Sequence, residues 1–346
     1  MKKVLVLAYG AVNLGDDLFV NILVNRYPNV IFYSNAIDQD SDIYKNNSNL
    51  EYFTLNYKDI SSSELLQFDA VVYIGGSIFM EHAIGVRGVE GLNDFALKCK
   101  DNNIPFFYIS CNFGPYTTLE FKNSIAKLLS NVTDICFRDI YSFEQFKNIH
   151  SVRYAPDAVF TYKMIPKTML DTVGISVIGK DLKQCKDRYY NLLMNSIINY
   201  VEQGKQVYLF SFCQIEGDEI TIDYILNNLP EKYRCFVKDV RYSGNLEEFI
   251  KIYSEMEYVV CTRFHSMILS HIFNQKKYVL SYSEKTDNVI RDLNLCSNFI
   301  TFKEVCQKNL IKLEEFECKK MDSEIEHMSQ EQFRALDDFL TKVEEI

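Results

Sequence analysis

Short apolar segments alternate with helical segments along almost the whole chain, and this alternation is the feature that most constrains the fold. The apolar runs Lys3–Ala8, Phe68–Ile74, Ile104–Ser110 and Asp134–Phe137 are each followed by a turn and then by apolar residues at helical spacing. A second series of the same kind begins near residue 170. Such alternation is typical of parallel sheets that are covered by helices on both faces. We therefore predict an α/β protein with two Rossmann-like parallel-sheet domains facing a cleft.

Two proline-containing segments interrupt this alternation near the middle of the chain. They are Ala155-Pro-Asp-Ala and Ile165-Pro-Lys. At 346 residues the chain is also long for a single hydrophobic core. We predict an N-terminal Rossmann-like domain over residues 1–165, a C-terminal one over 166–328, and a C-terminal helix within 329–346 that packs back on the first domain.

Composition and charge argue against several classes of protein. Acidic residues outnumber basic ones by 47 to 37, and no basic run exceeds a pair, so we expect no nucleic-acid partner. Because no apolar run approaches the ~20 residues that span a bilayer, we expect a cytoplasmic protein. The 10 cysteines are scattered without a C-x-x-C pair, which indicates reduced thiols rather than a zinc site or a disulfide framework.

Arg263 and His265 stand between an apolar strand-like run, Tyr258–Cys261, and the helical segment Ser266–Asn274. Charge-capable side chains in an apolar neighbourhood are costly unless they have partners. Ligands of α/β sheets bind outside the carboxyl ends of the strands, and the amides and dipole of a helix start favour an anion. We therefore predict an anion site here. A surface arginine and a satisfied core histidine are the structural alternatives.

Arg138 and Lys285 occupy comparable positions. Arg138 follows the apolar run Asp134–Phe137 and precedes a helix, and an ion pair with Asp139 or a neighbour would be its purely structural role. Lys285 follows a strand end and opens a helix, where it is either a point charge for an anion or an ordinary surface lysine.

The remaining candidates lie near other predicted strand ends. Gly75 and Gly76 permit close approach of the backbone to a ligand, or make a plain turn. Asn13 and Asp16 are candidates for ligand contact or for helix capping. Asp218 follows the strand QVYLFSFC, with structural and functional roles equally open. The histidines show no metal-ligand spacing, so we expect no metal, and dinucleotide, P-loop and G-x-S-x-G motifs are absent from the sequence.

Seven short motifs follow one another between Asn13 and Lys285: NLGDD, YIGGS, NFGP, CFRDIYS, APDAVF, CTRFHSMILSHIF and YSEK. A chain with this ordered set resembles the polysaccharide pyruvyl transferases, and R-x-H followed by Y-x-x-K is its most specific part. The resemblance implies a fold similar to the GT-B glycosyltransferases and a phosphoenolpyruvate-dependent enzyme with no further cofactor. The product would be a pyruvate ketal on a hydroxyl pair of a sugar in a cell-surface polysaccharide, an exopolysaccharide or capsule, or in its lipid-linked precursor.

The resemblance also implies roles for individual residues. Arg138 and Arg263 would bind phosphoenolpyruvate from the two domains, with Lys285 helping to hold its phosphate. His265 would carry the proton chemistry, because an imidazole titrates near neutral pH. The acceptor side would contain Asn13, Asp16, Gly75, Gly76 and Asp218. A lipid-linked acceptor would bring the enzyme to the inner face of the membrane as a peripheral protein, although the sequence has no basic amphipathic helix.

Two positions depart from the family pattern, and two other functions stay compatible with the sequence. Val12 stands where the family often has Gly, and Ser77 where it has a third Gly. Both changes concern the acceptor rather than the donor. The first alternative function is a GT-B-type nucleotide-sugar glycosyltransferase, since fold does not fix function. The second is a non-catalytic anion-binding module, which would bind its ligand without turnover.

Overall fold

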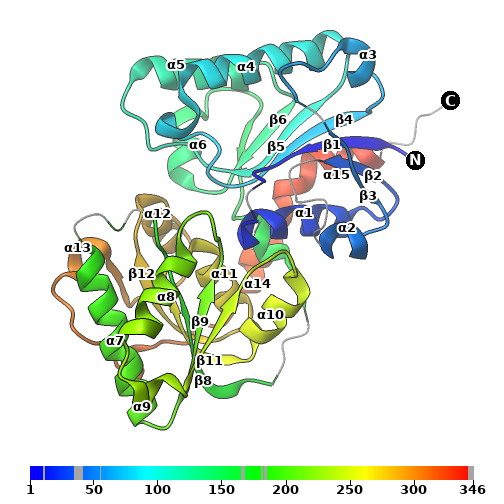
Figure 1. Ribbon diagram of the computed structural model, residues 1–346. Helices are drawn as coiled ribbons and strands as arrows, with labels where there is room; N and C mark the ends of the chain where they lie inside the picture. Colours follow the sequence, from blue (N-terminus) through cyan, green and yellow to red (C-terminus); the bar gives the residue numbers. More distant parts are fainter. Residues whose placement is uncertain are drawn as a thin grey trace. The chain divides into compact units, whose positions relative to one another are not determined.

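The computed structural model describes residues 1–10, 12–34, 42–54, 56–164, 168–180, 182 and 185–341. These residues form two compact α/β units (Figure 1). Of the described residues, the first unit holds 1–10, 16–161 and those from 324 onwards, and the second holds 12–15 and 162–323. The prediction of two parallel-sheet α/β domains is confirmed. The predicted junction at residue 165 lies outside the described residues, and the domain boundaries stay a prediction.

The sheet of the first unit has seven strands in the order β3-β2-β1-β4-β5-β6-β7, and all neighbours are parallel. Its central strands are apolar and buried on both faces, which is why they appear in the sequence as continuous apolar runs. The strands are β1 Lys3–Leu7, β2 Ile31–Ser34, β3 Leu50–Tyr52, β4 Ala70–Ile74, β5 Phe106–Cys111, β6 Asp134–Phe137 and β7 Val152–Tyr154.

Helices cover both faces of this sheet. Figure 1 shows α4 and α5 side by side over one face, with α1 and α15 on the other. The α-helices are α1 Leu14–Arg26, α2 Asp42–Asn46, α3 Ser62–Leu65, α4 Glu81–Asp101, α5 Leu119–Leu129, α6 Ile140–Phe146, α14 Ser323–Gln330 and α15 Arg334–Thr341, and 3₁₀ turns span Ala158–Thr161 and Glu331–Phe333.

The C-terminal segment is anchored to the first unit by a buried amide. Gln332 is 1% exposed; its Oε1 accepts from the amide of Ser110 at 2.8 Å, and its Nε2 donates to the carbonyl of Ala155 at 2.7 Å. Further along, Asp337 pairs with Arg26 of α1 at 2.7 Å. These contacts explain why residues from 324 onwards belong to the first unit although they follow the second in sequence.

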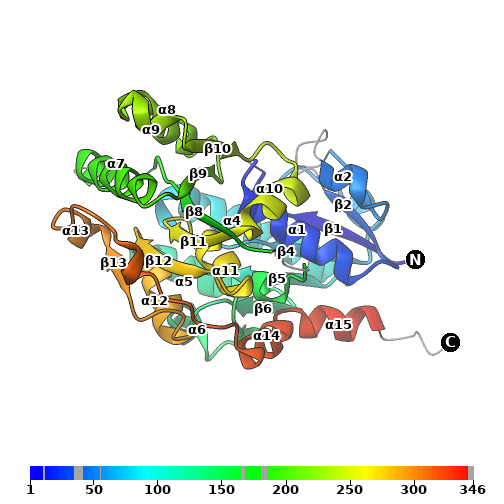
Figure 2. The same ribbon diagram turned by 90° about the horizontal axis from the view of Figure 1, so that it is seen from below.

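The second unit repeats the architecture with six parallel strands in the order β10-β9-β8-β11-β12-β13. Helices α7 and α8 cover one face of its sheet, and α10 and α11 the other (Figure 2). The strands are β8 Leu170–Ser176, β9 Gln206–Ser211, β10 Val237–Arg241, β11 Met256–Cys261, β12 Lys276–Ser281 and β13 Phe299–Thr301. The helices are α7 Lys186–Glu202, α8 Asp218–Asn228, α9 Glu231–Arg234, α10 Leu246–Ser254, α11 Phe264–Ile272, α12 Glu284–Asp292 and α13 Phe302–Val305, with a 3₁₀ turn at Leu313–Glu315.

Two helices begin earlier than their apolar spacing predicts. The apolar spacing in the sequence predicts helices over residues 18–26 and 92–99, whereas α1 starts at Leu14 and α4 at Glu81. The first part of α4 is separated by a kink at Gly85, where φ is 61°, and its polar and glycine residues hide the helical period. Asp16 lies inside the first turn of α1 and so is not the residue that precedes the helix, whereas the Asn13 side chain accepts from the amide of Gly15 at 3.0 Å, as a capping residue would.

Each sheet has one place where its strand order reverses. In the first sheet this is between β1 and β4, and in the second between β8 and β11. Ligands of open α/β sheets bind at such switch points, outside the carboxyl ends of the strands. We therefore expect the functional side chains to lie at the carboxyl ends of the strands next to these switch points.

Candidate active site

In the second unit, the site is organised by the junction between β11 and α11. Arg263 is the N-cap residue of α11, with extended backbone at φ −78° and ψ 142°. Its amide and that of Thr262 donate to the hydroxyl of Ser176, the last residue of β8, at 3.3 and 2.9 Å. The neighbouring strand at the switch point thus sets the direction in which Arg263 leaves the sheet.

The guanidinium of Arg263 is buried and carries two carboxylate partners. The residue is 6% exposed, its Nε donates to Asp218 Oδ2 at 3.0 Å, and its Nη2 and Nη1 pair with Asp218 and Glu216. Burial alone would lower the pKa of Arg263, but the charge of Asp218, with smaller contributions from Tyr282 and Glu216, raises it above the ordinary value. The arginine is therefore a fixed cation, held in one orientation by its bidentate pair.

Asp218 is held as rigidly as the arginine that it orients. It is the first residue of α8, is fully buried, and accepts from the amides of Phe212 and Cys213 at 3.0 Å each. Burial raises the pKa of Asp218, while Arg263 and the two amides act in the opposite direction. The sequence grouped Asp218 with the acceptor residues, but the structure groups it with Arg263, which it contacts directly.

His265 lies in the first turn of α11 and packs against Gly15. A Cβ at Gly15 would overlap the imidazole, so that only glycine leaves room for the ring where it now lies. Gly15 is held beside it because the amide of Leu14 donates to the carbonyl of Phe212 at 3.0 Å, and Asn13 forms an isolated β-bridge with Cys213. Asn13 and Gly15 thus belong to the same unit as His265, although we expected residues 1–165 to form the N-terminal domain, and the rest of their motif, from Asp16 on, belongs to the first unit.

Lys285 is the second residue of α12, at the carboxyl end of β12. Its ammonium lies 6.0 Å from the ring centroid of Tyr282, and its charge helps to lower the pKa of Glu216. The second unit therefore brings Arg263, His265 and Lys285 to neighbouring strand ends, together with Asp218 and Asn13.

In the first unit, Arg138 follows β6 and is bound by residues from two other strand ends. Its Nη1 pairs with Asp157 at 2.8 Å, and its Nη2 donates to Asn112 Oδ1 at 2.7 Å. The arginine and the aspartate are 3% and 0% exposed. The structural alternative named from the sequence was an ion pair with Asp139 or a neighbour. The pair is formed with Asp157, whereas the Asp139 carboxylate caps α6 by accepting from the amide of Ser142 at 2.8 Å.

Gly75, Gly76 and Asp16 lie close to this arrangement. A Cβ at Gly76 would meet the Arg138 guanidinium at 2.5 to 2.7 Å, and a Cβ at Gly75 would lie 3.7 Å from Asp16 Oδ1. Gly75 also has φ 149°, which disfavours other residues. The glycine pair therefore allows the loop after β4 to pass directly over Arg138.

Four residues to which the sequence assigned no role lie around Arg138 or Arg263 in the structure. Asn112 and Asp157 belong to the motifs NFGP and APDAVF, and both hold Arg138. Their place in the ordered motifs indicated that Asn112 and Asp157 matter, but no sequence spacing indicated that both bind Arg138. Glu216 and Lys180, which pair at 3.4 Å in the second unit, lie in loops without a recognisable motif.

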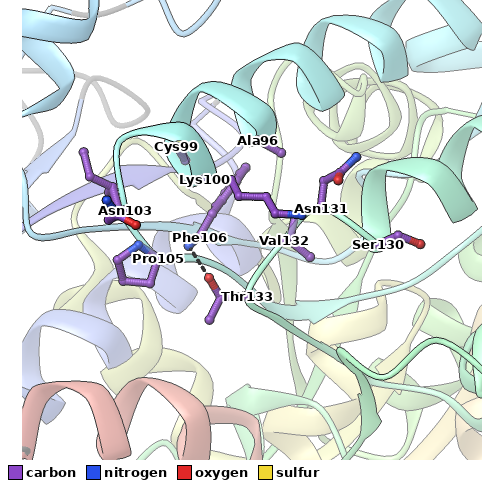
Figure 3. Close-up of a pocket in the computed structure, with 11 residues that line it drawn as sticks. Ala96, Cys99, Lys100, Asn103, Pro105, Phe106, Ser130, Asn131, Val132 and Thr133 are labelled. Carbon is purple, nitrogen blue, oxygen red and sulfur yellow. Dashed lines mark hydrogen bonds between the residues drawn. The ribbon is translucent and has the colours of Figure 1, made fainter.

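A surface pocket lies at the opposite end of the first sheet. It has a volume of about 330 Å³ and lies at the amino ends of β5 and β6. In Figure 3, the amide of Phe106 donates to Thr133 Oγ1, at 2.9 Å, at the floor of this pocket. The predicted site residues line none of it, and it lies away from the carboxyl ends of the strands.

Within the described ranges, no group of three or more His, Cys, Asp or Glu side chains is arranged to hold a metal ion. None of the helices in the described part of the chain is both long and apolar enough to cross a membrane.

Solved structures identify the class of fold. The UDP-GlcNAc 2-epimerase of Methanocaldococcus jannaschii superposes with a TM-score of 0.58 at 10% identity, over 98% of this chain and 100% of that one. MnaA of S. aureus, solved with UDP, gives 0.56 at 11% over 100% and 98% of the two chains. HepE of Anabaena, solved with UDP and glucose, gives 0.52 at 10% over 99% and 100%. At these identities the likeness concerns the fold alone, and it confirms the GT-B type.

The chain belongs to the polysaccharide pyruvyl transferase family, whose model matches residues 13–284. It is also similar to the amylovoran biosynthesis protein AmsJ of Erwinia amylovora, with 25% identity over 267 residues. That alignment covers 68% of this chain and 61% of AmsJ, so the chain matches about three fifths of that relative's length. The family resemblance inferred from the ordered motifs is thus confirmed.

Proposed function

We propose that this protein transfers the pyruvyl group of phosphoenolpyruvate to a hydroxyl pair of a sugar, forming a pyruvate ketal. The acceptor is a cell-surface polysaccharide, an exopolysaccharide or capsule, or its lipid-linked precursor. The observation that carries the proposal is the grouping of Arg263, His265 and Lys285 at two neighbouring strand ends of the second unit. Arginine and lysine can bind the two anionic groups of the donor, and histidine can transfer the proton that the reaction needs.

The donor would bind through its charges. Phosphoenolpyruvate carries a phosphate and a carboxylate, and the planar fork of a fixed arginine suits either group. Arg263 also stands at the N-terminus of α11, whose amides and dipole favour an anion. Lys285 opens α12 on the adjacent strand end and would add a point charge for the phosphate. Asp218 would act indirectly, by orienting Arg263.

His265 is the proposed acid and base. Protonated His265 would deliver a proton to the C3 methylene, which becomes the methyl group, while C2 becomes electrophilic. A sugar hydroxyl forms a C–O bond to C2. Its proton passes to His265 and replaces the proton that His265 delivered to C3. The C2–phosphate bond then breaks, a second hydroxyl bonds to C2, and its proton leaves with the phosphate. The sum is phosphoenolpyruvate and a diol giving a ketal and inorganic phosphate.

The first unit would contribute Arg138 to donor binding, and Asp16, Gly75 and Gly76 to the acceptor side. Asn13 stays in the proposal as an acceptor residue because its side chain accepts from the amide of Gly15, the residue against which His265 packs. We propose that no metal and no cofactor other than the donor takes part. Because the donor is a cytoplasmic metabolite, we also propose that the reaction takes place in the cytoplasm, at the inner face of the membrane when the acceptor is lipid-linked.

Thermal unfolding with phosphoenolpyruvate or UDP-glucose tests the donor assignment. At ~100 times its dissociation constant, the donor should stabilise the native state by about 2.7 kcal/mol. The shift should disappear in Arg263→Lys, which keeps the charge but loses the fork, and persist in part in His265→Ala. Arg291→Lys, an exposed arginine of α12, serves as the control and should respond like the unmodified protein.

Turnover is measured as phosphate released from phosphoenolpyruvate in the presence of an acceptor glycan. We expect His265→Ala to abolish release while binding persists. Stabilisation by UDP-glucose and not by phosphoenolpyruvate would replace the proposal with the nucleotide-sugar glycosyltransferase. Binding of phosphoenolpyruvate without release on any glycan would favour the non-catalytic anion-binding module.

A further inference from the structure

The carboxylate of Glu216 pairs with two cations of the second unit, Arg263 and Lys180. Its Oε2 pairs with Arg263 Nη1, and its Oε1 lies 3.4 Å from Lys180 Nζ. Burial would raise the pKa of Glu216, but the charges of Arg263, Lys180 and Lys285 outweigh it and lower the pKa. A protein carboxylate therefore occupies a position whose surroundings attract an anion.

The two carboxylates that contact Arg263 are held in different ways. Asp218 is fully buried, accepts from two backbone amides and begins a helix. The Glu216 side chain is 19% exposed and lies in the turn before α8, and its described partners are the ends of two long side chains. Asp218 is thus part of the framework, whereas Glu216 can leave Arg263 by rotation of its own side chain.

Two glycines bring Lys180 to this place. A Cβ at Gly179 would overlap the backbone of Gly217, so the loop after β8 packs directly on the turn that carries Glu216. The amide of Gly179 also donates to Asp218 Oδ1 at 3.3 Å. Lys180, the next residue, has a side chain that is 49% exposed and extends to Glu216. Its position follows from the same backbone contacts that position Arg263.

We infer that Glu216 occupies, in the protein without ligand, the position taken by an anionic group of the donor, and that Lys180 is a third cation of that subsite. The identity of the anion as phosphate or carboxylate of phosphoenolpyruvate rests on the proposed function. The ligand enters as the Glu216 side chain rotates away. Its anionic group then replaces the Glu216 carboxylate beside Lys180, Arg263 and Lys285. A doubly charged phosphate gains more from three cations than a single carboxylate does.

This inference has a consequence that a purely structural ion pair would not have. Removing the charge of Glu216 removes a competitor, so an anion should bind more tightly. If Glu216 served only to neutralise Arg263, its replacement would leave anion affinity unchanged or would weaken the fold. Removing Lys180 should weaken anion binding in either the presence or the absence of an acceptor.

Isothermal titration with inorganic phosphate and with phosphoenolpyruvate tests the inference on the full-length protein. We expect Glu216→Gln to lower the dissociation constant of both probes by about five- to tenfold, and Lys180→Met to raise it by about three- to tenfold. The controls are Glu219→Gln, the second residue of α8, and Lys232→Met on α9; both should stay within about twofold. If Glu216→Gln lowers the melting temperature, Glu216→Asp keeps the charge on a shorter side chain and should also bind more tightly.

The outcomes separate this inference from the proposed function. Unchanged or weaker phosphate binding by both Glu216 variants would overturn the inference, even if the unmodified protein releases phosphate from phosphoenolpyruvate. Tighter binding of inorganic phosphate by Glu216→Gln would support the inference even if no glycan supports turnover, in which case the proposed function fails alone.

Discussion

Arg138 and Asp157 form an ion pair of 2.8 Å in which neither side chain is more than 2% exposed. The pair joins the carboxyl ends of β6 and β7, and Asn112 adds a contact from the end of β5. Its position beneath the loop after β4 makes it a support for the surface on which we place the acceptor.

We expect Arg138→Met to lower the free energy of unfolding by about 3–5 kcal/mol, because it removes the positive charge that pairs with the buried Asp157 carboxylate. Urea denaturation measures the change. Arg334→Met, which breaks an exposed pair with Glu331, should cost less than about 1 kcal/mol. The double replacement Arg138→Met with Asp157→Leu should recover part of the loss. A single variant as stable as the unmodified protein would contradict the structural role of the pair.

Gly15→Ala should impair catalysis more than donor binding. The added methyl group overlaps His265, so the imidazole must move while Arg263 keeps its carboxylate partners. We expect kcat to fall by at least about tenfold, as happens when a reacting group is misplaced by about 1 Å, with little change in the dissociation constant of phosphoenolpyruvate. Gly91→Ala in α4 is the matched control, since its methyl group would make only ordinary contact, at 3.9 Å from Lys58. Equal kcat for Gly15→Ala and the unmodified protein would show that the position of His265 does not matter for turnover.

Val12→Gly should stabilise the protein by about 1 kcal/mol. Val12 has φ 45°, a left-handed conformation that costs an L-residue about 1–2 kcal/mol and is unusual for a β-branched side chain. Glycine removes that cost but loses more entropy on folding. Chemical denaturation with Val12→Ala alongside checks the cause: alanine keeps a Cβ and should gain less than glycine. A destabilised glycine variant would mean that the valine side chain contributes more than its backbone costs.

Acidification should destabilise the protein partly through His271. Burial, with the charges of Lys277 and Lys319, lowers the pKa of His271 to about 3, and only Asp322 acts in the opposite direction. The unfolded chain takes up a proton near pH 6.5 and the folded one does not, so stability falls as the pH drops from about 6.5 towards 3. Between pH 7 and pH 5 we expect His271→Gln to lose about 2 kcal/mol less stability than the unmodified protein, as urea titrations at both values would measure. Parallel losses in the two proteins would rule out His271 as the source.

The fold was predictable from sequence because its strands are buried on both faces and therefore form continuous apolar runs. Where that signal is weak, the prediction missed an element. Strands β7 and β13 lie at the edges of their sheets, have three residues each and are only partly buried. Arg263 and Arg138 were found because each follows an apolar strand directly.

The partners of these arginines were not predictable in the same way. Asp157 lies 19 residues after Arg138, and Asp218 lies 45 residues before Arg263. Only the order of the strands in the sheets brings these residues together. The assignment of Asp218 to the acceptor side stays a prediction. Its contact with Arg263 was missed because the two residues lie far apart along the chain.

The placement of residues 12–15 in the second unit has a consequence for comparing or recombining members of the family. The chain passes from one unit to the other after residues 10, 15, 161 and 323, so neither unit is a single continuous stretch. A hybrid joined once, near residue 161, would combine Gly15 from one parent with His265 from the other. Hybrids that exchange the second unit must therefore carry residues 12–15 with it, and inheritance of this short loop should decide which of them are active.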